Sequence, residues 1–288
     1  MADSSVDSRA GGFTVRFWGV RGSIACPGKE YDRYGGNTSC LEVRCGDTLL
    51  IFDGGTGLRK LGLELMKDKP PSVGLDGSIF LTHTHVDHIA GIPFFAPFFC
   101  SKSNWKIWAG NLLPEKRLED VLCQFMAEPI FPVPPTIFNA GMAFCDFEVG
   151  QELGPFGGVT IKTAPLNHPN GATGYRIECC GGAICYVTDT EHEVGALDEN
   201  ILGLIEGADL LIYDCSYTDE EFPKYVGWGH STWQQGVRLA RAAGVKRLAI
   251  FHHDPSHDDD AMDRIAEEAA REFQGAFVAR EGDLLTIA

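Results

Sequence analysis

The hydrophobic pattern of the first third of the chain is that of strands joined by tight turns. Residues 13–20 alternate between apolar and polar side chains, and residues 40–46 and 48–55 form two further short apolar segments that meet at Gly46 and Asp47. Alternation with period two and a glycine-containing turn predict strands, the last two forming a hairpin. Residues 57–67 carry leucines at helical spacing, so they predict a helix.

The rest of the chain repeats this order of short strands followed by helices. Apolar segments predict strands at 79–82, 158–166, 174–180, 183–190, 208–216 and 247–253. Helices are predicted at 115–127, within 193–206, at 230–244 with Ser231 or Thr232 as N-cap, and at 258–273, and the closing residues 277–288 predict a hairpin. Two halves of this kind predict an α/β fold, a four-layer αββα sandwich of two mixed, mostly antiparallel sheets with outer helices. We expect one domain over 12–288, preceded by a disordered lead at 1–11.

The net charge and the cysteine content limit which partners and which cellular compartment we expect. The net charge of −16 and the pI of about 4.9 disfavour an extended nucleic acid as partner, because non-specific affinity for phosphates needs cations. The longest apolar stretch, 89–100, is too short to span a bilayer, and residues 1–12 have no apolar signal core. The ten cysteines contain no zinc-ribbon pair, which predicts reduced thiols in a cytoplasmic protein.

The central chemical signal is His83-Thr84-His85-Val86-Asp87-His88, which follows an apolar strand. In extended backbone, residues two apart point the same way, so His83 and His85 can chelate one ion. Asp87 and His88, where the chain turns into a helix, can face a second. Imidazole and carboxylate ligands favour zinc, with manganese or iron as alternatives. We therefore expect two divalent ions per chain.

Further candidate ligands also follow apolar strands. His168 follows the strand at 158–166, and Asp189, near the end of 183–190, could bridge two ions with one carboxylate. His252 and His253 both end the last of these strands, so the residues alone leave the final ligand open. Loops at strand ends are where layered folds gather a site.

These motifs resemble a known family. The segment HTHVDH resembles the HxHxDH signature of the metallo-β-lactamase superfamily. GGNTSC (35–40), IFDGGTG (51–57), VTDT (187–190) and the segment 230–253 resemble its ribonuclease Z and cyclic-phosphodiester phosphodiesterase branch. The resemblance runs from about Phe17 to Pro255.

The resemblance implies roles for individual residues. It implies His83, His85 and His168 as ligands of the first ion, Asp87, His88 and His252 as ligands of the second, and Asp189 as the bridge. It implies that His230 protonates the leaving group, oriented by Asp214, with Asp87 counted among the catalytic residues. Asp53 is expected to support a ligand histidine from behind, and Gly54, Gly55 and Gly57 could let backbone N–H groups approach an anion.

The predicted function is a dinuclear-metal hydrolase acting on small or cyclic phosphodiesters through a metal-bridging hydroxide. The alternatives are a ribonuclease Z-like tRNA 3′ endonuclease and a hydrolase of another bond, such as a lactone or thioester. Residues 104–136, where a tRNA-binding arm would lie, are few and carry little positive charge, which disfavours the endonuclease. A silent scaffold domain is disfavoured by the complete ligand set. The phenylalanines at 94–99 could be core, a pocket wall or a homodimer interface.

Overall fold

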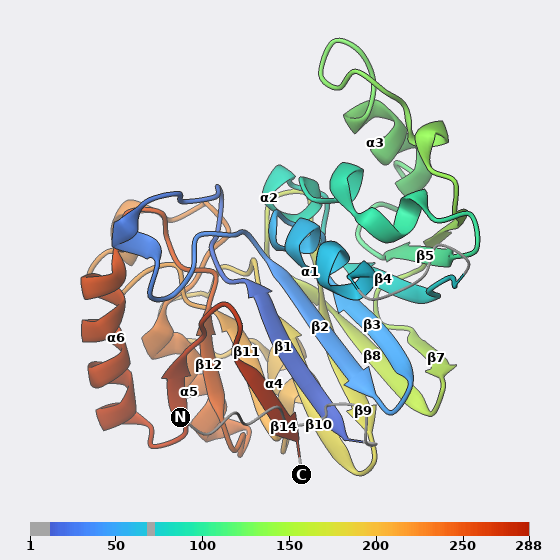
Figure 1. Cartoon of the computed structure of the whole chain (residues 1–288). Helices are drawn as coiled ribbons and strands as arrows, with labels where there is room; N and C mark the ends of the chain where they lie inside the picture. Colours follow the sequence, from blue (N-terminus) through green and yellow to red (C-terminus); the bar gives the residue numbers. More distant parts are fainter. Residues whose placement is uncertain (1–11, 68–72, 288) are drawn as a thin grey trace, which may run out of the picture.

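Two β-sheets pack face to face, and helices cover their outer faces (Figure 1). The structure is a computed structural model that describes residues 12–67 and 73–287. The predicted αββα sandwich is confirmed. The lead predicted at 1–11 lies outside the described residues.

The first sheet has seven strands, in two differently connected parts. Its order is β14 (Leu284–Ile287), β1 (Phe13–Gly19), β2 (Cys40–Cys45), β3 (Thr48–Phe52), β4 (Gly77–Leu81), β5 (Asn104–Ala109) and β6 (Gly141–Asp146). Pairings from β14 to β3 are antiparallel, and those from β3 to β6 are parallel.

The second sheet repeats this plan. Its order is β13 (Ala276–Val278), β12 (Leu248–Phe251), β11 (Leu210–Asp214), β10 (Gly182–Val187), β9 (Ala172–Cys179), β8 (Val159–Leu166) and β7 (Glu152–Phe156). Pairings from β7 to β10 are antiparallel, and those from β10 to β13 are parallel. The sheets are mixed as predicted, but antiparallel pairs do not predominate, because helical crossovers join the later strands of each sheet and crossovers produce parallel neighbours.

Six α-helices are assigned within the described residues. They are α1 (Gly57–Met66), α2 (Val86–Ile89), α3 (Leu118–Phe125), α4 (Glu199–Ile205), α5 (Trp233–Ala242) and α6 (Asp259–Glu272). Helix α1 packs on β1 and β2, while α4 packs on β8 and β9 and α5 on β11 and β12. Thr232 is the N-cap of α5, because its hydroxyl accepts from the Gln235 N–H at 3.0 Å. None of the helices in the described ranges is both long and apolar enough to cross a membrane.

The closing segment is not the hairpin that its sequence predicts. Strand β13 pairs with β12 in the second sheet, whereas β14 pairs with β1 in the first. The chain crosses between the sheets near Gly282, whose φ of +93° suits a turn without a side chain. Each strand thereby pairs with an edge that would otherwise be open, β14 with β1 in the first sheet and β13 with β12 in the second.

The cysteines also depart from the sequence-based prediction at one place. Cys45 and Cys179 form a disulfide that joins β2 to β9, so the prediction of reduced thiols is wrong for this pair. The other eight cysteines are free.

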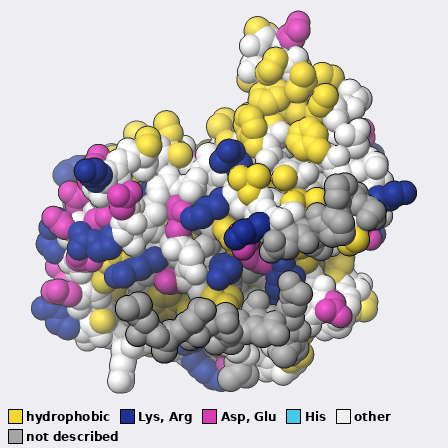
Figure 2. Space-filling view, viewed as in Figure 1, with side chains coloured by type: hydrophobic (Ala, Val, Ile, Leu, Met, Phe, Trp, Pro, Cys, Tyr) yellow, Lys and Arg dark blue, Asp and Glu magenta, His cyan; other side chains and the backbone are white. Residues whose placement is uncertain are grey.

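The phenylalanines at 94–99 divide between core and surface. Phe95 and Phe98 are fully buried against Trp105, with ring centroids 4.8 and 5.9 Å from it, while Phe94 is 52% exposed. The exposed phenylalanines continue into the projecting part that contains α3, where Figure 2 shows hydrophobic side chains gathered on the surface.

The difference in burial between Phe95 and Phe94 predicts that their substitution has unequal effects on stability. Phe95→Ala should lower the free energy of unfolding by about 3–5 kcal/mol, because it removes a buried ring and leaves a cavity. Phe94→Ala is the matched control and should change it by less than about 1 kcal/mol. Urea unfolding of both variants measures the difference, and equal losses would contradict the assignment of Phe95 to the core.

Candidate metal centre

The candidate ligands lie at one end of the sandwich, in the short helix α2 and in loops that follow strands. His83 and His85 follow β4, Asp87 and His88 belong to α2, His168 follows β8, Asp189 follows β10 and His252 follows β12. These strands come from both sheets. The packing of the two sheets therefore brings together residues that are up to 169 positions apart (83 to 252).

The structure divides these side chains into two groups. Ligand atoms of His83, His85 and His168 lie within 4.8 Å of one another, as do those of Asp87, His88, Asp189 and His252. The division matches the two ligand sets that the resemblance implies.

The carboxylate of Asp189 lies between the groups. Its Oδ1 is 3.8 Å from Nε2 of His83 and 3.7 Å from Nε2 of His168. Its Oδ2 is 3.2 Å from Nε2 of His88 and 3.3 Å from Nε2 of His252. One oxygen thus faces each group, which is the arrangement a bridging ligand needs.

Four of the histidines are held from behind through Nδ1. Asp53 Oδ2 lies 2.8 Å from Nδ1 of His88, and the Gly229 carbonyl oxygen lies 2.7 Å from Nδ1 of His168. The hydroxyls of Thr82 and Ser216 lie 3.1 and 3.0 Å from Nδ1 of His83 and His252. Such contacts fix the ring through Nδ1 and leave Nε2 to face the cluster, where Nε2 of His168 lies 3.1 Å from Nδ1 of His85.

Imidazole nitrogens without a hydrogen-bond partner show whether the two ligand groups fit a metal ion. Nε2 atoms of His83, His88 and His252 are buried and have no hydrogen-bond partner. A buried polar atom without a partner is costly, and coordination of a cation would satisfy all three. The residues present therefore fit a divalent ion in each group.

His253 lies elsewhere. Its Nε2 is 2.9 Å from the Ala279 carbonyl oxygen. Burial, reinforced by the nearby Arg21 charge, lowers the pKa of His253 to about 3, so the ring is neutral. Of the two histidines that the sequence left open, the structure brings only His252 to the cluster.

The glycines after Asp53 do not form an anion site. The N–H of Gly54 donates to the His88 carbonyl at 2.7 Å, that of Gly55 to Ser39 and that of Gly57 to Thr38. The prediction that they approach an anion is therefore wrong. They let α2 pack closely, since a Cβ at Gly55 would lie 2.3 Å from the Asp87 carbonyl oxygen.

Asp53 is the buried acceptor behind the motif. It accepts from the Thr82 N–H at 2.8 Å and the Tyr186 hydroxyl at 2.7 Å, besides its contact with His88. Asp53→Asn places an amide N–H₂ among these donors, although asparagine tolerates the φ of +61° found there. Metal affinity should fall by roughly 10–100-fold.

Competition with a chromogenic chelator would measure this loss. Asp47→Asn, in the exposed β2–β3 turn, is the control and should keep the affinity of the unchanged chain. An unchanged affinity in Asp53→Asn would show that this carboxylate does not support the metal ligands.

His230 and Asp214 form a pair beside the cluster. Asp214 Oδ2 lies 3.0 Å from Nδ1 of His230 and also accepts from the Asp189 N–H at 3.1 Å. Burial works against the charged imidazole, but the attraction and hydrogen bond of Asp214 prevail and raise the pKa of His230 to about 9. The pair can therefore hold a proton beside the two ligand groups.

Neighbouring groups of opposite charge also keep Asp189 in its charged form. Burial favours its neutral form, yet the facing His252, His88 and His83 hold the pKa of Asp189 well below its ordinary value. The position between the two ligand groups is thus occupied by a carboxylate with two accepting oxygens.

Sequence patterns missed several supporting residues. Gly22 is required because a Cβ there would lie 2.3 Å from Nδ1 of His252, and Gly229 because a Cβ would lie 2.2 Å from Nδ1 of His168. Ser216 and Tyr186 were also not singled out. Their contacts cross between strands, so no local motif signals them.

A cavity of about 450 Å³ opens beside the first group. Its lining residues are His83, Thr84, His85, Asn111, Leu112, Glu115, Lys116, Val121, Gln124 and Asn170. Most of the lining comes from α3 and the segment before it, so the projecting part forms one wall of the site.

Comparison with known proteins places the chain in a family. Residues 48–253 match the model of the β-lactamase superfamily domain. The chain belongs to the metallo-β-lactamase superfamily. This match covers most of the chain and includes all seven candidate ligands.

Individual relatives are similar to the chain over most of its length. Ribonuclease Z of Thermoplasma volcanium is 26% identical over 94% of this chain and 96% of its own length. The metallo-β-lactamase fold protein YhfI of Bacillus subtilis has a similar structure, with a TM-score of 0.70 and 21% identity over 96% of this chain and 99% of that one. A diphosphatase of the PhnP family has a TM-score of 0.65 and 20% identity over 95% of this chain and 96% of that one.

These findings confirm the ribonuclease Z-like branch of the superfamily. They also confirm a metal-dependent hydrolase, since the fold of this family implies a divalent metal and the described residues supply a matching His/Asp cluster.

Proposed function

We propose that this protein is a phosphodiesterase that uses two divalent ions, zinc by preference, to hydrolyse small or cyclic phosphodiesters. The observation that carries the proposal is the position of Asp189, which presents one carboxylate oxygen to each ligand group. His83, His85 and His168 would hold one ion, and Asp87, His88 and His252 the other. When bound, such ions supply Lewis acidity and an activated water.

The residues around the ions would carry out the remaining steps. Asp87 would hold negative charge at one ion, and Asp189 would present one carboxylate oxygen to each ligand group. His230 holds a proton at its imidazole and donates it to the departing oxygen, while Asp214 orients the ring through Nδ1. No protein nucleophile is required.

The size of the cavity and the net charge of the chain support a small substrate. A volume of about 450 Å³ suits a mononucleotide-sized ligand, and Lys116 is the one cationic side chain in its lining. Amide side chains of Asn111, Gln124 and Asn170 offer hydrogen bonds to a neutral polar group. The net charge of −16 would repel a long polyanion.

The second candidate function is tRNA 3′ processing. It is favoured by the similarity to ribonuclease Z of Thermoplasma volcanium, which extends over 94% of this chain. Helix α3 and the loop after it project from the body as an arm would (Figure 1). Hydrolysis of a lactone or thioester is a third candidate, since one fold can serve several chemistries.

One assay separates these candidates. Purified, metal-quantified protein is tested with bis-p-nitrophenyl phosphate, 2′,3′- and 3′,5′-cyclic nucleotides and a precursor tRNA, beside His85→Ala. Near two ions per chain, with turnover of the small diesters that His85→Ala abolishes, is the expected result. Cleavage of tRNA alone would favour the endonuclease, and two bound ions without diester turnover would exclude the phosphodiesterase.

We place the enzyme in the cytoplasm because eight of its ten cysteines are free. A homodimer stays a prediction, for which the exposed Phe94, Phe99 and Ile130 are candidate contacts.

A further inference from the structure

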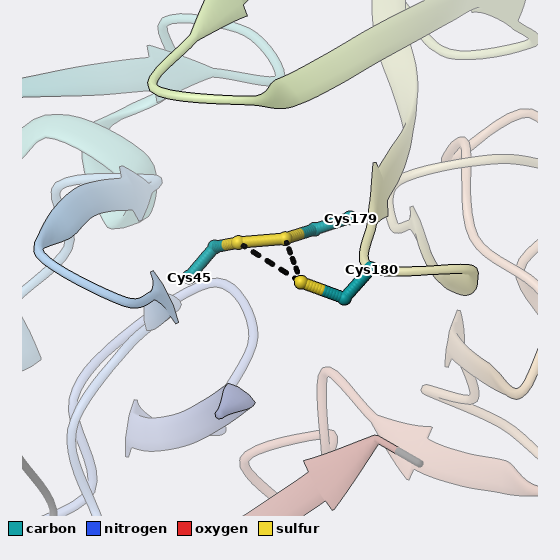
Figure 3. Close-up of side chains that lie close together, drawn as sticks. All are labelled: Cys45, Cys179 and Cys180. Atoms are coloured by element: carbon teal, nitrogen blue, oxygen red, sulfur yellow. Dashed lines mark hydrogen bonds between the residues drawn. A yellow bond between two sulfur atoms is a disulfide. The ribbon is translucent and has the colours of Figure 1, made fainter. Parts of the chain in front are cut away.

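Three cysteine sulfurs converge at the opposite end of the sandwich from the metal centre. Cys45 ends β2, Cys179 ends β9 and Cys180 occupies the β9–β10 turn. Figure 3 shows the three side chains pointing toward one another. Sγ of Cys180 lies 3.2 Å from Sγ of Cys179 and 3.8 Å from Sγ of Cys45.

The turn itself gives an independent reason to assign a role to Cys180. Cys180 and Gly181 have φ of +55° and +83° between the paired residues Cys179 and Gly182. A two-residue hairpin turn with both φ values positive prefers Asn-Gly, and a cysteine rarely adopts this conformation. Backbone preference therefore does not explain Cys180, whereas the position of its thiol does.

We propose that this cluster, in its reduced form, binds one thiophilic d¹⁰ cation such as Zn(II) or Cu(I). Three thiolates are soft ligands that select such ions. At a Zn–S distance of about 2.3 Å, tetrahedral ligands lie ~3.8 Å apart, and Cys45 and Cys180 already have this separation of 3.8 Å. Cys180 is exposed, so solvent can complete the coordination.

Loading the site requires that the Cys45–Cys179 disulfide is first reduced. A dithiol transfers two electrons to this bond and becomes a cyclic disulfide, which leaves thiols at Cys45 and Cys179. The cation then displaces the protons of three thiols and binds three thiolates. Because β2 and β9 belong to different sheets, the bound cation would hold the two sheets together and stabilise the folded chain.

Cadmium is a suitable probe, because its thiolate complexes absorb in the ultraviolet. The full chain is reduced with dithiothreitol, desalted without oxygen and titrated with Cd²⁺, and we expect a thiolate-to-cadmium absorption band and a higher Tm. Cys180→Asn, which keeps a residue that the turn prefers, should lose the band and bind one Cd²⁺ fewer per chain. Cys45→Ser should do the same.

A control variant and two contrary results complete the cadmium experiment. Cys123→Ser removes an exposed cysteine outside the cluster and should keep the band and the stoichiometry. Absence of the band in the reduced unchanged chain, or an equal band in Cys180→Asn, would overturn the proposal. Ligands of the proposed catalytic centre are nitrogen and oxygen, so this readout does not depend on the phosphodiesterase.

Discussion

Replacing Asp189 by asparagine should lower the turnover of bis-p-nitrophenyl phosphate by more than roughly 10³-fold, equal to about 4 kcal/mol of transition-state stabilisation. Asparagine has nearly the same shape and tolerates the φ of +63° at this position. It offers one accepting oxygen in place of two, so one of the ligand groups loses its share of the bridge. The amide N–H₂ would also face Nε2 nitrogens that should bind a cation.

Metal content provides the second readout of this variant. We expect fewer than two ions per chain, measured by mass spectrometry of the metal after gel filtration. Asp198→Asn is the matched control, because asparagine also serves as an N-cap and Asp198 caps α4. Full metal content with unchanged turnover in Asp189→Asn would contradict the bridging role.

His230→Ala should reveal its role through the leaving group. Loss of a general acid should lower turnover of a 2′,3′-cyclic nucleotide by about 10²–10⁴-fold, because an alkoxide leaves poorly without a proton. Turnover of bis-p-nitrophenyl phosphate should fall by less than about 10-fold, since nitrophenolate leaves readily as an anion. A purely structural role of His230 would lower both rates by the same factor.

The structural basis of the prediction for His230→Ala is the contact between His230 and Asp214. Asp214 is fully buried, and its carboxylate raises the pKa of His230 to about 9, which favours the protonated ring. Divalent ions bound beside the pair lower this value by repulsion but leave the orientation through Nδ1 in place. His192→Ala is the control, because His192 contacts Ser231 rather than Asp214.

The sequence by itself determined the class of fold and the most compact part of the site. Strand and helix periodicity predicted most elements, because a buried face imposes its period on the side chains locally. The motif from His83 to His88 could be recognised because its ligands lie within six residues, and local backbone geometry orients them. Thr232, one of the two N-cap candidates of the sequence, caps α5 through a contact only three residues away, whereas the expected support of a ligand histidine by Asp53 spans 35 positions.

Only the tertiary structure decided features that depend on contacts between the sheets. The choice of His252 over His253 required knowing which ring faces Asp189. The assignment of β13 and β14 to different sheets depended on which sheet edges were open, and the Cys45–Cys179 disulfide on two turns distant in sequence. A linear pattern records the periodicity of one segment, but contacts between distant segments depend on how the whole chain packs.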